Sequence, residues 1–175
     1  MHLYAGEHMF ANIVLGIDPG LTTTGYGVIE ASRGKEHAVA AGVIRTNPDA
    51  PAAERLGELH RDLTAVIAEH KPTEAAIERI FQNRNRNTAM AAARASGVAL
   101  LAVCQAGITV HEYTPSAVKM ALCGVGNVPK EQVERVVSLR LGLHSVPGPA
   151  DAADALAVAL CHLQHAGARR IEASA

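Results

Sequence analysis

The chain of 175 residues contains no tryptophan, three tyrosines and two phenylalanines, so only 3% of it is aromatic. Its three cysteines, Cys104, Cys123 and Cys161, are odd in number, far apart and without a C-x-x-C pair. Such cysteines are typical of free thiols in a reducing compartment, so we expect no disulfide framework. The nine histidines include no H-x-x-x-H pair that would suggest zinc.

Long apolar runs are also missing. No stretch of about 18 apolar residues occurs, so we expect no ordinary membrane span and no membrane partner. The first residues, MHLYAGEHMFA, lack the basic segment that opens a signal peptide, which favours a cytoplasmic protein. Because 49% of the residues are apolar, we expect one folded domain over residues 12–166. Residues 1–11 are interpreted as an N-terminal extension or an added leader, and 167–175 as a C-terminal tail.

Charge is nearly balanced, with a formal net charge of −1, which alone argues mildly against nucleic acid. The distribution is uneven. Between Arg79 and Lys130 the sequence has six basic residues and one acidic residue, Glu112, so the rest of the chain is correspondingly acidic. This asymmetry predicts a basic surface, although a solvated face without a partner remains the alternative.

Hydrophobic periodicity predicts an α/β fold. Three strand-like runs come first, followed by helices that alternate with two further strands, which implies a sheet antiparallel on one side and parallel on the other. The alanine-rich helix would pack closely on the sheet or on a partner chain. The expected strands are 12–18, 24–31, 37–46, 74–81 and 107–113, and the expected helices are 51–72, 87–105, 114–122, one from 130 and one from about 151.

Four acidic residues interrupt apolar elements, namely Asp18, Glu78, Asp151 and Asp154. The first three have simple alternatives, as a turn residue, a strand end facing water and a helix cap. Asp154 is harder to explain, because it lies past the cap in the apolar sequence ADAADALAVAL, where an unpaired carboxylate is costly to bury. A divalent cation with oxygen ligands would remove that cost.

If strands 12–18 and 74–81 are neighbours, all four carboxylates can meet at one site. They could then hold two Mg²⁺ ions about 4 Å apart, an arrangement used for phosphodiester hydrolysis. His162 follows Asp151 by three helical turns, or roughly 16 Å, so we interpret it as structural and not as a ligand of that site.

Three motifs, GIDPGLTTTGYGVIE, AAIERIF and PADAADALAVALCH, together resemble the RuvC family of bacterial Holliday junction resolvases over residues 12–166. The resemblance implies an RNase H-like fold of the retroviral integrase superfamily, with a mixed five-stranded sheet flanked by helices. It also implies a homodimer that makes symmetric paired nicks in four-way DNA junctions during recombination and repair, leaving 5′-phosphate and 3′-hydroxyl ends. The catalytic, metal-binding tetrad would be Asp18, Glu78, Asp151 and Asp154, with Mg²⁺ as cofactor and Mn²⁺ as an alternative ion. RuvA–RuvB would be a partner.

The resemblance also assigns DNA contacts. Phe81 would stack on an unpaired base, and Lys119 and Lys130 would meet phosphates near the active site. A core position for Phe81 and roleless surface lysines are the alternatives. Arg84 and Arg86 belong to an Asn/Arg loop, QNRNRN, and would contact the DNA backbone. The end of the chain lacks the basic tail of some relatives, so binding should depend on the central basic stretch and weaken with salt.

Three other functions fit parts of the sequence. An actin- or Hsp70-like ATPase also starts with a strand and GID-G, but it needs two such domains and leaves Asp154 unexplained. A catalytically silent junction-binding module would have lost one or more of the four acids, and all four are present. A ribonuclease H acting on RNA–DNA hybrids would have a similar metal site, and a dimeric architecture would separate a resolvase from it.

Overall fold

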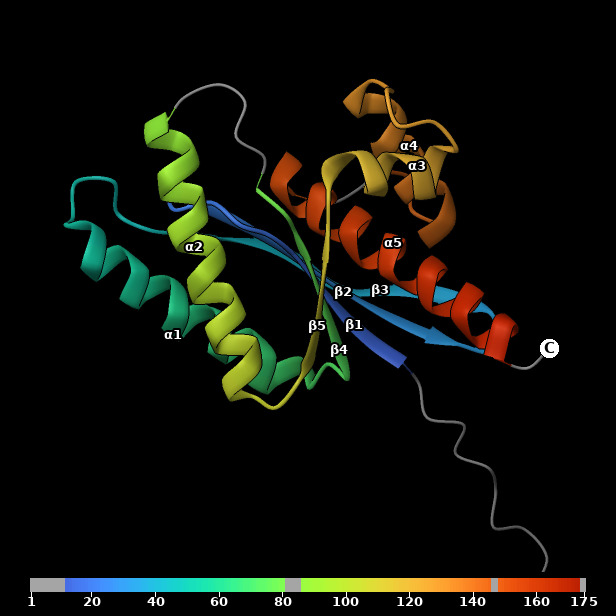
Figure 1. Cartoon of the computed structure of the whole chain (residues 1–175), viewed down its shortest axis with the longest axis horizontal. Coiled ribbons are helices and arrows are strands. Elements are labelled where there is room, and N and C mark those ends of the chain that lie inside the picture. The colour runs from blue at the N-terminus through green and yellow to red at the C-terminus, as the bar shows by residue number, and fades with distance from the viewer. Residues whose placement is uncertain (1–11, 81–85, 146–147, 174–175) are drawn as a thin grey trace, which may run out of the picture.

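A computed structural model describes residues 12–80, 86–145 and 148–173. Within these residues, five strands form one sheet in the order β3-β2-β1-β4-β5, and five helices cover it (Figure 1). The strands are β1 Asn12–Asp18, β2 Thr23–Ser32, β3 Lys35–Arg45, β4 Glu74–Glu78 and β5 Thr109–Tyr113. The helices are α1 Ala52–His70, α2 Arg86–Gln105, α3 Pro115–Cys123, α4 Lys130–Leu141 and α5 Ala150–Ala173.

Strand β1 lies at the centre of this mixed sheet. It pairs antiparallel with β2 on one side and parallel with β4 on the other, which confirms the predicted neighbourhood of the two strands. In the parallel register Ile17 is opposite Ile77. Because parallel strands end at the same edge of a sheet, the carboxyl ends of β1 and β4 are adjacent.

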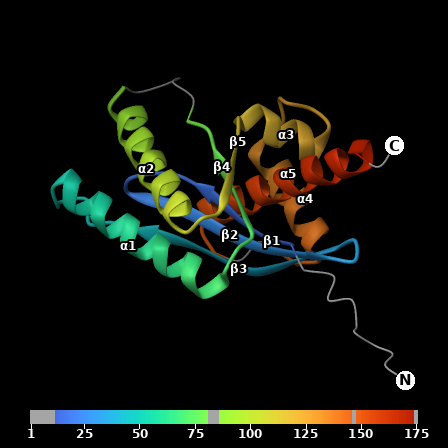
Figure 2. The ribbon, with the colours of Figure 1, turned by 60° about the horizontal axis from the view of Figure 1, so that its bottom comes forward.

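The helices form two layers with the sheet between them (Figures 1 and 2). One face is covered by α1 and α2, which bury a core that includes Leu15, Ile17, Leu59, Leu63 and Ile77. Such aliphatic side chains supply most of the folding free energy, at roughly 25 cal/mol per Å² of apolar surface removed from water. The layered arrangement agrees with the predicted RNase H-like class.

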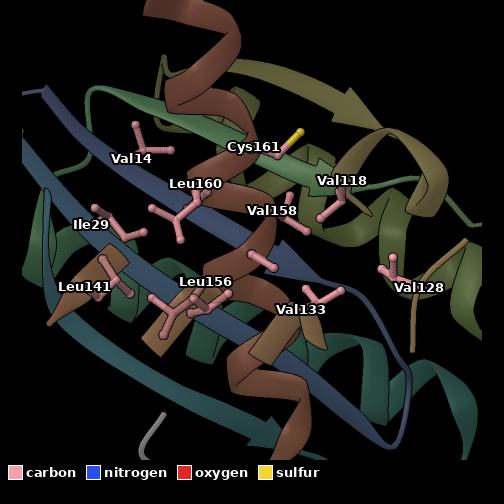
Figure 3. Close-up of a cluster of buried hydrophobic side chains, with 14 residues drawn as sticks. Val14, Ile29, Val118, Val128, Val133, Leu141, Leu156, Val158, Leu160 and Cys161 are labelled. Carbon is pink, nitrogen blue, oxygen red and sulfur yellow. The ribbon is translucent and has the colours of Figure 1, made fainter. Parts of the chain in front are cut away.

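The other face is covered by α3, α4 and α5. Figure 3 shows α5 crossing the strands, with Leu156 and Leu160 directed into the cluster that contains Val14 and Ile29. Leu156 and Leu160 are four residues apart and therefore lie on one side of the helix. These two leucines pack α5 against the centre of the sheet.

Two glycines allow the backbone of α5 to pack directly against the backbone of the strands. A Cβ atom on Gly16 would overlap the carbonyl oxygen of Ala155, and one on Gly25 would overlap the carbonyl oxygen of Asp151. Side chains at these positions would therefore push the helix away from the sheet. The motif GIDPGLTTTGYG thus owes part of its glycine content to helix packing.

Some predicted boundaries need correction. The strand expected over 74–81 ends at Glu78, and the strand expected from 107 begins at Thr109. The predicted cap of α3 is confirmed, since the Thr114 hydroxyl accepts a hydrogen bond from the amide of Ala117 at 3.1 Å and Pro115 is the first helical residue.

Helix α2 corrects one further expectation. Within the described part of the chain, its segment Asn87–Gln105 is long and apolar enough to cross a membrane by length and composition, although the sequence was expected to contain no such run. The same test is passed by core helices of soluble proteins, and one such helix is weak evidence of a span. One side of α2 is buried against the sheet and α1 through Ala95, Ala99 and Val103, whereas only 28% of the apolar segment is buried in all.

Candidate active site

The first component of the site is the end of β1. Asp18 is its last residue, and Pro19-Gly20 begins the turn to β2. The buried hydroxyl of Thr24 donates a hydrogen bond to the carbonyl oxygen of Gly20 at 2.6 Å and closes this turn. The turn thereby holds the Asp18 carboxylate at the edge of the sheet.

The second component is the end of β4. Side chains alternate across a strand, so Glu78 lies on the same face as Ala76, which packs in the cluster beneath α5. Asp18 is on that face too, because it lies two residues after Gly16, whose α-carbon faces α5. The two carboxylates therefore lie on neighbouring strands under the start of α5.

The third component is the first turn and a half of α5. Asp151 and Asp154 are three residues apart, so they share one side of the helix. Gly25, which is opposite Asp18 in the sheet, brings the backbone of Asp151 into contact with β2. The helix N-terminus also favours these carboxylates as anions through its dipole.

Electrostatic interactions couple the four acids. Burial raises the pKa of Asp18 to about 7, assisted by the negative charges of Asp154 and Asp151. Burial likewise raises the pKa of Glu78 to about 7, assisted by Asp18 and Asp154. Nearby like charges and loss of water both disfavour the ionised form. The centre therefore carries more negative charge than the protein itself neutralises.

Two lysines offset part of this charge. The Lys130 ammonium, at the start of α4, lies 2.5 Å from a carboxylate oxygen of Asp154. Burial alone lowers the pKa of Lys130, but its contact with Asp154 prevails and raises it above the ordinary value. Lys119 of α3 is close enough to lower the pKa of Glu78. Both predicted basic positions thus border the carboxylates.

The donor chemistry of these residues suits a divalent metal. All four candidate ligands are carboxylates, which are the donors preferred by hard cations such as Mg²⁺. Burial, and after it the neighbouring negative charges, raise the pKa values of Asp18 and Glu78, so a cation among these carboxylates would be stabilising. The ammonium of Lys130 already occupies one such position beside Asp154.

Three of the predicted DNA contacts have no described side chain. Phe81 and Arg84 lie outside the described residues. Arg86 is the first residue of α2, and its side chain also lies outside the described part. Their roles remain predictions.

His162 lies apart from the carboxylates, as expected from its place along α5. It is fully buried, and its ring nitrogens contact a carboxylate oxygen of Glu74 at 2.6 Å and the hydroxyl of Tyr113 at 2.9 Å. Sequence reasoning missed Glu74 and His111, which complete this cluster. The available signal was the alternation of β4, which places Glu74 on the same face as Glu78.

Comparison with known proteins identifies the family. The family model described as crossover junction endodeoxyribonuclease RuvC matches residues 14–162. A curated RuvC of Salinispora arenicola is 50% identical over 164 residues, covering 93% of this chain and 94% of that protein. A second, from Pelotomaculum thermopropionicum, is 46% identical over 153 residues, covering 87% and 93%.

Solved structures agree. Thermus thermophilus RuvC superposes with a TM-score of 0.80 at 38% identity, covering 88% of this chain and 95% of that one. The same protein in complex with a Holliday junction substrate gives a TM-score of 0.83 at 38% identity, covering 89% and 94%. With the family model spanning most of the chain and two homologues at 46–50% identity, the chain belongs to the RuvC family of crossover junction endodeoxyribonucleases.

Proposed function

We propose that this chain is a metal-dependent endonuclease that resolves four-way DNA junctions by symmetric paired nicks, leaving 5′-phosphate and 3′-hydroxyl ends. The observation that carries the proposal is the meeting of four electrostatically coupled carboxylates from β1, β4 and α5 at one edge of the sheet. The homologues named crossover junction endodeoxyribonucleases support the same reaction. The catalytic residues would be Asp18, Glu78, Asp151 and Asp154.

The cofactor we propose is Mg²⁺, with two ions per active site and Mn²⁺ as an alternative ion. Such ions activate a water molecule and stabilise the leaving 3′ oxygen in phosphodiester hydrolysis. The carboxylates would hold them from two rigid supports, the strand ends with Asp18 and Glu78 and the helix start with Asp151 and Asp154. Because these supports are packed by glycine contacts, the ligands are held in place before DNA binds.

Lys130 and Lys119 would contact the phosphate backbone next to the carboxylates. Both are on helices of the α5 face, and both already lower the pKa of Glu78. A DNA phosphate brings further negative charge to an acidic site, and these ammonium groups reduce the resulting repulsion. Phe81, Arg84 and Arg86 are proposed to extend this contact to the junction itself.

Two symmetric cuts suit a homodimer, and we propose α2 as its interface. Only 28% of the apolar segment of α2 is buried within one chain. Met90 and Leu101 of this helix are 57% and 50% exposed, which is unfavourable unless another surface covers them. Family resemblance adds RuvA–RuvB as a partner and the cytoplasm as the location.

The activity can be tested with a labelled synthetic four-way junction and a linear duplex, each with Mg²⁺ and with EDTA. Paired nicks in the junction alone, requiring metal and lost in Asp154→Asn, are expected. Junction binding without any cutting would favour a silent binding module. Cutting of an RNA–DNA hybrid in preference to the junction would favour a ribonuclease H.

A further inference from the structure

A second cluster of metal-ligating side chains lies on the α5 face of the sheet. Glu74 opens β4, His111 lies within β5 and His162 lies in α5. Among the residues described, these three offer ligand atoms that all lie within 4.8 Å of one another. Ligands from three separate elements therefore converge on one point.

This cluster is separate from the carboxylate site. On β4, Glu74 precedes Glu78 by four residues, or about 13 Å of strand. On α5, His162 follows Asp154 by eight residues, or about 12 Å of helix. No single ion can bridge such a distance, so the two groups of ligands act independently.

The ligand atoms lie close to the spacing that a single ion requires. The Nε2 atoms of His162 and His111 lie 2.6 Å and 3.8 Å from the same carboxylate oxygen of Glu74. In a tetrahedral zinc site, with metal–ligand bonds of about 2.0–2.1 Å, ligand atoms are about 3.3 Å apart. The observed separations lie on either side of this value, and small side-chain rotations would equalise them.

The buried histidine has the support that a metal ligand needs. Tyr113 contacts its Nδ1 at 2.9 Å, which leaves Nε2 directed at Glu74. Without an ion, Nε2–H donates to the Glu74 carboxylate, which as an anion can only accept. When Nε2 loses this proton to bind an ion, the Tyr113 hydroxyl can accept a hydrogen bond from Nδ1–H and hold the ring in the metal-binding tautomer. The rings of His111 and His162 are stacked, with centroids 4.5 Å apart, so both imidazoles are held in place.

The cluster is also reachable from solvent. His162 is fully buried, whereas the side chains of His111 and Glu74 are 33% and 26% exposed. An ion can therefore enter from the side of His111, where a water molecule could supply a fourth ligand.

We propose that Glu74, His111 and His162 form a second metal site that binds Zn²⁺ in preference to Mg²⁺. Two imidazoles and one carboxylate are typical ligands of zinc, whereas Mg²⁺ prefers oxygen ligands alone. The ion would join β4 and β5 to α5. These elements include the strand and the helix that carry three of the four catalytic carboxylates, so the site would stabilise the frame of the active centre.

The proposal can be tested on the full chain, stripped of metal with a chelator and returned to excess Mg²⁺ to occupy the carboxylate site. Zn²⁺ is then titrated against a chromophoric chelator, and Co²⁺ is titrated while its visible d–d bands are recorded. One Zn²⁺ per chain is expected to bind in the presence of Mg²⁺. Co²⁺ should give the intense bands of a four-coordinate ion.

Variants locate the site. His111→Asn, at a half-exposed position that should still fold, is expected to lower Zn²⁺ affinity by more than about 100-fold, and Tyr113→Phe by about 10- to 100-fold. His144→Asn, at an exposed histidine outside the cluster, is the matched control and should bind as the wild type does. Zn²⁺ should also raise the melting temperature of the wild type but not of His111→Asn.

Two results would overturn the proposal. One is no Zn²⁺ binding in excess Mg²⁺, which would make the cluster a hydrogen-bonded network only. The other is equal binding by the wild type and His111→Asn, which would place the ion elsewhere on the chain, including at His2 or His8. None of these measurements uses DNA cleavage, so they stand apart from the nuclease test.

Discussion

Strand β4 and helix α5 together carry two polar clusters of opposite character, one at the end of β4 and the start of α5, the other at the start of β4 and the middle of α5. Where β4 ends and α5 begins, burial and the negative charges of Asp18 and Asp154 raise the pKa of Glu78 to about 7. Where β4 begins, Glu74 is hydrogen-bonded to His162, which also contacts Tyr113. One cluster is a centre of unbalanced charge, and the other is a network of matched donors and acceptors.

The difference shows how a small domain can tolerate a strained site. Repulsion among buried carboxylates costs stability, and it persists only if the surrounding packing holds the groups together. Here the packing is supplied by the glycine contacts of α5 and by the aliphatic cluster beneath it. The four predictions below perturb the carboxylate cluster, and the first uses Glu74 of the other cluster as its control.

The largest effect is expected from Asp154→Asn. Loss of one member of a group that acts as a unit should reduce junction cleavage by at least about 10³-fold. Glu74→Gln, at the opposite end, is the matched control and should change cleavage in saturating Mg²⁺ by only a few-fold. Single-turnover cleavage of a labelled junction measures both. Equal losses of cleavage in the two variants would contradict the distinction between the carboxylate cluster and the Glu74 cluster.

The next effect concerns helix position. Gly25→Ala would place a methyl group against the backbone of Asp151, so we expect a destabilisation of about 3 kcal/mol together with a severe loss of cleavage. Gly57→Ala is the control, because Gly57 lies in α1 with open space around it and should gain about 0.5–1 kcal/mol. Urea unfolding of both variants measures the difference. A Gly25→Ala protein as stable as the wild type would contradict the close approach.

The third prediction concerns the pH dependence of stability in metal-free protein. The pKa of Asp18 is about 7 when folded and near 4 when unfolded, so the folded chain binds more protons between these values. Stability from this group is therefore fully present below pH 4 and is lost as the pH rises through 7.

The substitution Asp18→Asn removes the loss of folding stability that the ionisation of Asp18 causes at high pH. In EDTA the stability of the variant relative to the wild type should be greater at pH 8 than at pH 5 by about 2 kcal/mol, because the wild type loses stability across that interval. Mg²⁺ should raise the melting temperature of the wild type more at pH 8 than at pH 5. Thermal unfolding at the two pH values measures both effects, and a pH-independent difference would contradict the raised pKa.

The smallest effect on stability is expected from Lys130→Met. Its half-exposed ion pair with Asp154 should contribute less than about 1 kcal/mol. Cleavage should nevertheless fall by about tenfold, because the phosphate loses a cationic contact. Lys35→Met, at the exposed first residue of β3, is the control for charge. Unchanged cleavage in Lys130→Met would remove this lysine from the site.

Sequence patterns predicted much of this arrangement. The class, the order of elements and the four acids follow from periodicity and from carboxylates placed in apolar surroundings. The parallel pairing of β1 with β4 had to be assumed and could not be predicted. The two strands are about 60 residues apart, so no local sequence pattern indicates that they pair. The contact of Lys130 with Asp154 was not predicted either, since it depends on the angle at which α4 meets α5.

The His162 cluster also shows that contacts between distant elements could not be predicted from the sequence. The position of His162 along α5 correctly separated it from the carboxylates. Its partners could not be found, because Glu74, His111 and His162 come from three elements that only the folded sheet brings together. Ligand spacing within a single segment, such as H-x-x-x-H, does not detect sites of this kind.

The most direct test of the carboxylate centre is anomalous diffraction from crystals of the full chain grown with Mn²⁺, with a second set soaked in Zn²⁺. We expect Mn²⁺ density among Asp18, Glu78, Asp151 and Asp154, and additional Zn²⁺ density at Glu74, His111 and His162. Mn²⁺ density elsewhere on the chain, with the four carboxylates directed apart, would contradict the assignment of these residues as one metal-dependent nuclease centre.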